Sequence, residues 1–288
     1  MKVSEHVTPQ LQSLLGELRD VLARLSTPDD EAIHDLRVAL RRLRSLLRPL
    51  RDVYDADSVV EARDALKAIG DASSELRDEE VLGELLGDLD VPKATKTATS
   101  RWLTTRATTT ARLRTTFVRS LTEGALQQAV DLVDAVISIP PKAKRDVDVV
   151  VFARKVVWQA QRDIEKTLRA GKGDVEGLHE LRIDYKRLRY AIDGLESALA
   201  PELVSMRDVA TRLQKRLGDL HDIDVAKVIV GAARTLSAMH RTRLLVALEE
   251  CRDHAISKFH ADAGPRGAAL TVGPAPASLP ALLASGGA

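Results

Sequence analysis

Residues 33–54 decide the fold of this chain, and they read I-H-D-L-R-V-A-L-R-R-L-R-S-L-L-R-P-L-R-D-V-Y. The stretch holds one histidine and six arginines but only two aspartates, whereas the whole chain of 288 residues carries a formal net charge of +1. Its leucines recur every three or four positions, which is the spacing of a helix with one buried face. The stretch therefore predicts an amphipathic helix that concentrates positive charge in a nearly neutral chain.

On a helical wheel, the apolar and basic residues of this stretch form two adjacent rows. At about 100° per residue, the apolar row fills an arc of about 100° and consists of Ile33, Leu36, Leu40, Leu43, Leu47 and Leu50. The basic row beside it is about 21 Å long and consists of His34, Arg37, Arg41, Arg44 and Arg48. Arg42 points away from the row. Because no acid lies on this row, its cations repel one another unless an anion binds them.

The chain repeats this pattern. Residues 33–44 match residues 178–189 at a separation of 145, from the histidine through the four basic positions. Residues 18–20 parallel residues 161–163, and residues 76–81 parallel residues 220–225, at separations of 143 and 144. Three matches in the same order at nearly one separation predict an internal duplication.

The second copy also predicts an apolar row and a basic row on one helix. Its apolar row consists of Leu178, Leu181, Tyr185, Leu188, Ile192 and Leu195. Its basic row consists of His179, Arg182, Lys186 and Arg189, and Asp193 stands where the first copy has Arg48. The sequence thus predicts an all-α protein of two pseudo-symmetric helical bundles around a central basic cleft. An alternative interpretation is that both basic rows face solvent and bind no ligand. The presence of two equivalent rows argues against it.

Composition limits the class of protein. Hydrophobic residues make up 44% of the chain and aromatic residues 3%, so aliphatic side chains must fill the core. The lone cysteine, Cys251, excludes an internal disulfide and a zinc site built from several thiolates. We find no signal peptide and no apolar run of about 18 residues, so we expect a cytoplasmic protein without a membrane segment.

The expected domain boundaries follow from the repeat and from proline and glycine. We expect a first helical repeat over 1–139, a linker over 140–145, a second repeat over 146–261 and a disordered tail over 262–288. Within the repeats we expect helices over 7–25, 31–53, 58–70, 72–88, 95–121 and 123–138, then from 146 to 261 with breaks near 171–173 and 200–201. Pro49 is expected to kink or end its helix early.

The rows favour an extended polyanion as ligand. Arginine offers a fork of donors to phosphate oxygens, and a row of this length suits a chain of phosphates better than a single phosphate. The rows contain no Asn, Gln or Ser in a position to recognise bases, and few aromatic residues on which bases could stack. This pattern predicts phosphate recognition without base recognition, as for inorganic polyphosphate.

The duplicated H-x-L-R-x-x-x-[RK]-R-L-R helix, followed by L-x-x-L-G-x-x-x-D, resembles the CHAD family of conserved-histidine α-helical domains. The resemblance covers about residues 5–261 and implies polyphosphate binding without catalysis, without a cofactor or metal, often at polyphosphate granules. One departure is Ser73-Ser74, where the second copy has Leu217-Gly218; it predicts a looser contact between helices in the first copy.

The resemblance also implies a set of binding residues. The motif positions are His34, Arg37, Arg41, Arg42, Arg44, His179, Arg182, Lys186, Arg187 and Arg189, to which the wheel adds Arg48. Arg42 and Arg187 match the motif but are turned off the rows. Equivalent positions on other helices add Arg77, His221, Arg19 and Arg162, and one turn before His221 lie the weaker candidates Lys215 and Arg216.

Two other functions remain open at this point. His221-Asp222 is the HD dipeptide of metal-dependent phosphohydrolases, but neighbours on a helix point about 100° apart, and the repeat equivalent of His221 is Arg77. Binding of nucleic acid through its phosphates alone is the second alternative, and competition with polyphosphate would distinguish it. The sequence does not indicate an oligomeric state.

Overall fold

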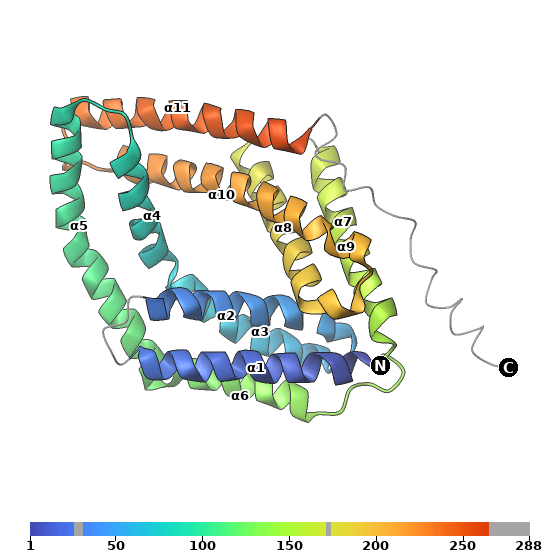
Figure 1. Ribbon diagram of the computed structural model, residues 1–288. Coiled ribbons are helices and arrows are strands. Elements are labelled where there is room, and N and C mark those ends of the chain that lie inside the picture. The colour runs from blue at the N-terminus through green and yellow to red at the C-terminus, as the bar shows by residue number, and fades with distance from the viewer. Residues whose placement is uncertain (26–30, 171–173, 265–288) are drawn as a thin grey trace.

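The structure is a computed structural model, which describes residues 1–25, 31–170 and 174–264. These residues are almost entirely helical, and the helices are arranged around a ring (Figure 1). The α-helices are α1 (Val3–Arg24), α2 (Glu31–Leu47), α3 (Ala56–Ala72), α4 (Ser74–Asp88), α5 (Lys93–Ser120), α6 (Leu126–Ser138), α7 (Val149–Ala170), α8 (Val175–Leu195), α9 (Pro201–Val204), α10 (Met206–Gly231) and α11 (Ala238–Ala263). Short 3-10 or π segments lie at Arg48–Asp52, Leu121–Ala125 and Glu196–Ala198. None of the described helices is long and apolar enough to cross a membrane.

The helix that opened the sequence analysis is α2, and its apolar row is buried as predicted. All six residues of that row are at most 5% exposed. In the second copy the equivalent row of α8 is also buried, apart from Leu178, which is partly buried. Pro49 ends α2 early, because the chain changes to a 3-10 turn at Arg48–Asp52 with Pro49 in its first turn.

Three apolar clusters form the core. The first joins α1, α2, α3 and α6 with the start of α7. The third lies among α7, α8, α10 and α11. The second combines α4 and α5 with α10 and α11, so elements of both predicted repeats share it. The chain between Ile139 and Asp148 connects α6 to α7, where a linker was expected; the duplication itself stays a prediction from the sequence.

One expected helix was wrong. We expected helix to continue from 201 to 261, but the chain leaves the helix after Gly231 and resumes at Ala238. The amides of Ala232 and Ala233 still bond to carbonyls of the last turn of α10, and the Ser237 side chain accepts a hydrogen bond from the His240 amide to cap α11. The break lets α11 fold back antiparallel to α10 (Figure 1).

The threonine-rich segment forms a single helix of 28 residues, α5. Several of its threonines bond back to a carbonyl one turn earlier, as Thr99 does to Thr95 at 2.9 Å, which satisfies the hydroxyl within the helix. After α5 the chain bends at Gly124, whose φ of 123° only glycine adopts readily. The helix predicted from 123 therefore starts at Leu126 instead. The predicted break at 171–173 and the tail beyond 264 lie outside the described residues.

Candidate functional site

The basic rows of α2 and α8 come together in the structure. Burial, together with the positive charges of Arg41, Arg182, Arg44 and Arg189, lowers the pKa of Lys186 on α8 to about 8. Two of these four arginines lie on α2 and two on α8 itself. The faces that the wheel predicted from each helix alone are therefore close in space.

We refer to the cations of this junction as the basic cluster. Each member lies close enough to another for their positive charges to repel. The members are Arg37, Arg41, Arg44, Arg48, Arg63, Arg77, Arg182, Lys186, Arg187 and Arg189. All except Arg63 were among the residues predicted from the sequence. The cluster joins α2, α3, α4 and α8 and includes both predicted repeats.

Several members of the basic cluster have a buried Nε atom that makes no hydrogen bond. The Nε atoms of Arg44, Arg63, Arg182 and Arg189 are buried without a hydrogen bond. Within residues 1–25, 31–170 and 174–264, no carboxylate lies at ion-pair distance from Lys186, Arg44 or Arg182. Leaving a buried donor unsatisfied costs about 1–3 kcal/mol. A bound anion would offset the repulsion among these cations.

Arg37 and Arg182 occupy equivalent positions in the two copies but differ in their partners. Arg37 Nη1 donates to the Ser73 carbonyl at 2.7 Å and to the Ser73 hydroxyl at 2.5 Å. Arg182 instead packs against Gly218, with its Nε 3.8 Å from the position a Cβ would take there. The departure at Ser73 thus gives the first copy a hydrogen-bonded contact between α2 and the α3–α4 junction. Arg182 makes no equivalent hydrogen bond to its neighbouring helix.

Carboxylates also lie beside the basic cluster. Arg187 Nη1 donates to Asp184 at 2.8 Å, Arg77 lies 3.5 Å from Glu80, and two further aspartates come from α4 and α10. Asp78 on α4 neighbours Arg37 and Arg77, and Asp222 on α10 neighbours Arg182 and Arg77. Burial raises the pKa of both aspartates, and the nearby arginines oppose that rise. These acids partly neutralise the cluster at its α4–α10 side.

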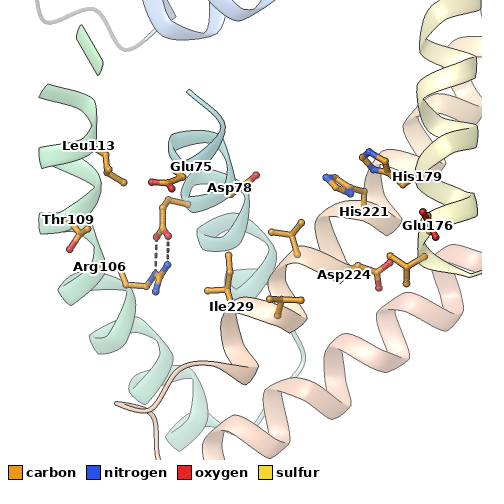
Figure 2. Close-up of a pocket in the computed structure, with 14 residues that line it drawn as sticks. Glu75, Asp78, Arg106, Thr109, Leu113, Glu176, His179, His221, Asp224 and Ile229 are labelled. Atoms are coloured by element: carbon orange, nitrogen blue, oxygen red, sulfur yellow. Dashed lines mark hydrogen bonds and ion pairs between the residues drawn. The ribbon is translucent and has the colours of Figure 1, made fainter. Parts of the chain in front are cut away.

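The two partly buried histidines of the second copy form a pair. The ring centroids of His179 and His221 lie 5.0 Å apart, and the two side chains point toward one another (Figure 2). Burial lowers the pKa of His221 to about 4, and the charges of Arg182 and His179 contribute. Burial also lowers the pKa of His179. Both rings are therefore neutral at pH 7 and can offer hydrogen bonds but no charge.

A cavity of about 820 Å³ opens beside this histidine pair, between α4, α5, α8 and α10 (Figure 2). Apolar side chains line it together with carboxylates, among them Glu75, Glu176 and Asp224. Glu79 on its wall pairs with Arg106 through two hydrogen bonds. The acidic lining does not suit a polyanion, so we distinguish this cavity from the basic cluster.

Six of the predicted residues are not members of the basic cluster as defined above. Arg42 pairs with Glu17 on α1, Arg19 with Asp134 on α6, and Arg216 with Asp262 on α11. Arg162 lies over the ring of Trp158, and Lys215 neighbours Asp219. His34 is exposed and makes no hydrogen bond or ion pair with another described residue. The motif and the repeat relate these positions in sequence, but the five cations interact with other parts of the chain, whereas His34 shares the helix face of Arg37 and Arg41.

Arg63 is the member of the basic cluster that the sequence analysis missed. It lies on α3 beside the buried Ala62 and Leu66. Its counterpart at a separation of 144 is Arg207, the same separation that relates residues 76–81 to residues 220–225. The repeat therefore contained the signal, but only the packing of α3 on α2 shows that Arg63 faces the basic rows.

The metal alternative depends on His221 and Asp222. His221 lies beside His179, whereas Asp222 lies beside Arg182. Across the portion of the chain that the structure describes, no group of three or more His, Cys, Asp or Glu side chains is placed to hold a metal ion.

Fold and cluster together define an all-helical protein that gathers arginine and lysine from four helices at one junction. A family model, the CHAD domain, matches residues 5–230, so the chain belongs to the CHAD domain family. This family is associated with polyphosphate-related proteins.

Solved structures of similar fold support the same assignment. The crystal structure of the CHAD domain from the plant Ricinus communis matches with a TM-score of 0.63 and 19% identity, over 89% of this chain and 86% of that one. PptA from Streptomyces chartreusis matches with a TM-score of 0.66 and 17% identity, over 91% of this chain and 98% of that one. At these identities the likeness concerns the fold. A search among curated proteins finds no match.

Proposed function

We propose that this protein binds inorganic polyphosphate at the basic cluster, by electrostatic attraction and hydrogen bonds and without turning it over. The observation that carries the proposal is the meeting of the basic rows of α2 and α8, where Lys186 lies among four arginines and Lys186, Arg44 and Arg182 have no carboxylate of the described residues at ion-pair distance. A bound polyanion would supply the missing negative charge. Membership of the CHAD family supports the same ligand.

The chemistry of the cluster favours a chain of phosphates over other anions. Arginine supplies most of its charge, and a guanidinium binds phosphate oxygens through two parallel hydrogen bonds. The cluster extends along α2 from Arg37 to Arg48, about 16 Å at 1.5 Å per residue. Each phosphate of a linear chain presents acceptors at a regular spacing, so several arginines can be satisfied by one ligand.

Charge reversal across the junction tests the proposal. We expect the double variant Arg41→Glu/Arg182→Glu to lose binding of long-chain polyphosphate, with at least a hundredfold fall in affinity measured by titration calorimetry. This follows because each lost charge-assisted hydrogen bond is worth about 1.5–3 kcal/mol. Neither side chain bonds to another helix, so circular dichroism should show the fold retained.

A matched control is the double variant Arg119→Glu/Arg169→Glu. It makes the same change of net charge at two exposed arginines, each of which pairs only with a glutamate four residues away in the chain. We expect this control to bind polyphosphate within about twofold of the wild type, because long-range charge is screened at physiological ionic strength. Equal loss in both double variants would contradict the site, and absence of wild-type binding would contradict the function.

Two further measurements distinguish polyphosphate binding from the nucleic-acid and metal-dependent alternatives. Duplex or single-stranded DNA at equal phosphate concentration should displace polyphosphate poorly, since the cluster has few aromatic side chains on which bases could stack. Chelator should leave binding unchanged, and incubation should release no free phosphate. Strong displacement by DNA would favour the nucleic-acid alternative, and chelator-sensitive phosphate release would favour the metal-dependent hydrolase.

A further inference from the structure

The two copies differ at the end of the basic rows. In the first copy, Arg48 and Arg63 neighbour each other at the end of α2 and on α3. The positions that correspond to them in the second copy hold Asp193 and Arg207. The first copy thus has two cations at this place, whereas the second copy has an anion and a cation.

The cations of the first-copy end have no ion-pair partner. No carboxylate of the described chain lies within ion-pair distance of Arg48 or Arg63, and the Nε of Arg63 is buried without a hydrogen bond. Burial lowers the pKa of Arg63, and the charges of Arg44, Arg51 and Arg187 lower it further, while Asp64 opposes them. Arg44 extends toward the same place, because its Nη1 lies 3.5 Å from where a Cβ on Gly70 of α3 would be.

The corresponding place in the second copy is neutralised within the protein. Arg207 pairs with Glu196 at 2.7 Å and lies 3.9 Å from Asp193. Asp193 also lies 3.8 Å from Arg189. An anion that approached Arg207 would have to compete with two carboxylates that are already in place.

From this asymmetry we infer that Arg48 and Arg63 form an end subsite that binds one phosphate group of the chain, and that the second copy has no such subsite. Arg187 lies beside them but already donates to Asp184 at 2.8 Å. The inference rests on the proposed function, because it extends the same ligand beyond the rows of α2 and α8. At the other end of the cluster, Asp78, Asp222 and the acidic cavity disfavour further phosphates. A bound polyphosphate would therefore lie asymmetrically, and its chain would continue toward α3.

The test compares Arg63→Ala with Arg207→Ala, its matched control at the equivalent position. With long-chain polyphosphate as the probe, we expect Arg63→Ala to weaken binding about tenfold, which corresponds to the loss of one charge-assisted hydrogen-bonding partner. The slope of log affinity against log salt should fall by about one. Arg207→Ala should keep both the affinity and the slope of the wild type.

A substitution that keeps the positive charge distinguishes loss of a binding contact from a folding defect. Arg63→Lys keeps the charge but loses the fork of donors, so we expect it to keep the wild-type salt slope with an intermediate affinity. Wild-type affinity and slope in Arg63→Ala, together with lost binding in Arg41→Glu/Arg182→Glu, would overturn the end subsite and leave the proposed function standing. Equal weakening by Arg63→Ala and Arg207→Ala would overturn the asymmetry. No binding by the wild type would overturn both proposals.

Discussion

Lys186 shows most clearly how the cations of the cluster repel one another. Four arginines surround it, and its pKa lies at about 8 instead of the ordinary 10.5. A bound polyanion stabilises the charged form and raises that pKa. Binding above pH 8 must therefore be accompanied by uptake of a proton.

The affinity for polyphosphate should accordingly depend on pH in the alkaline range. Below about pH 7 the lysine is charged in both free and bound protein, so affinity should be constant. If the pKa of bound Lys186 returns to about 10.5, affinity should fall about tenfold between pH 7 and pH 9. Calorimetry across this range checks the prediction. Lys186→Arg keeps its charge and should give a flat profile, and an equal decline in that variant would refute the assignment.

Residue identity alone predicted much of the site. The row on α2 and its copy on α8 could be derived from leucine and arginine spacing, because the period of a helix fixes which side chains share a face. Arg63, Asp78 and Asp222 could not, since their position depends on how α3, α4 and α10 pack. The wheel predicted the separation of Arg42 from the cluster, against the family motif. It also turned Arg187 off its row, yet Arg187 lies beside Arg48 and Arg63.

At the scale of elements, the bend between α5 and α6 depends on Gly124. A side chain at its φ of 123° is strained, so Gly124→Ala should lower the free energy of unfolding by about 1–2 kcal/mol. Urea denaturation measures this difference. Gly16 serves as the control, because it lies within α1 with open space around it, and Gly16→Ala should raise stability by about 0.4–1 kcal/mol. A neutral result at Gly124 would show that the π segment can rearrange.

Elements with strong periodicity were predicted well and irregular ones less well. The sequence located α2, α8 and the end of α2 at Pro49, because apolar spacing and proline act locally. The break at 232–237 was missed, since Gly231 is the only glycine or proline there and Ser237 caps α11 without other local signals. Threonine is a weak helix former, but in α5 several hydroxyl groups bond back to the helix, which removes the competition for its backbone.

For the molecule as a whole, polyphosphate should act as a stabilising crosslink. In the proposed binding mode the ligand would contact cations of both predicted repeats and bind only the folded chain, so at about 100 times its Kd it should add about 2.7 kcal/mol. That corresponds to a rise in Tm of about 5 to 10 °C for a chain of this size. Differential scanning calorimetry should show one transition, because α10 and α11 belong to two of the three apolar clusters. The Arg41→Glu/Arg182→Glu variant should show no rise, and an equal rise in that variant would place the ligand elsewhere.

The cluster shared by α4, α5, α10 and α11 also has a consequence during synthesis. Leu82 on α4 and Leu244 on α11 belong to this cluster but lie 162 residues apart in the chain. At about 5–20 residues per second, the ribosome needs roughly 10 to 30 s to make the second after the first. During that interval Leu82, Leu86 and Trp102 have no partner from the second half, so the nascent chain exposes an apolar surface that a chaperone can bind before the ring closes.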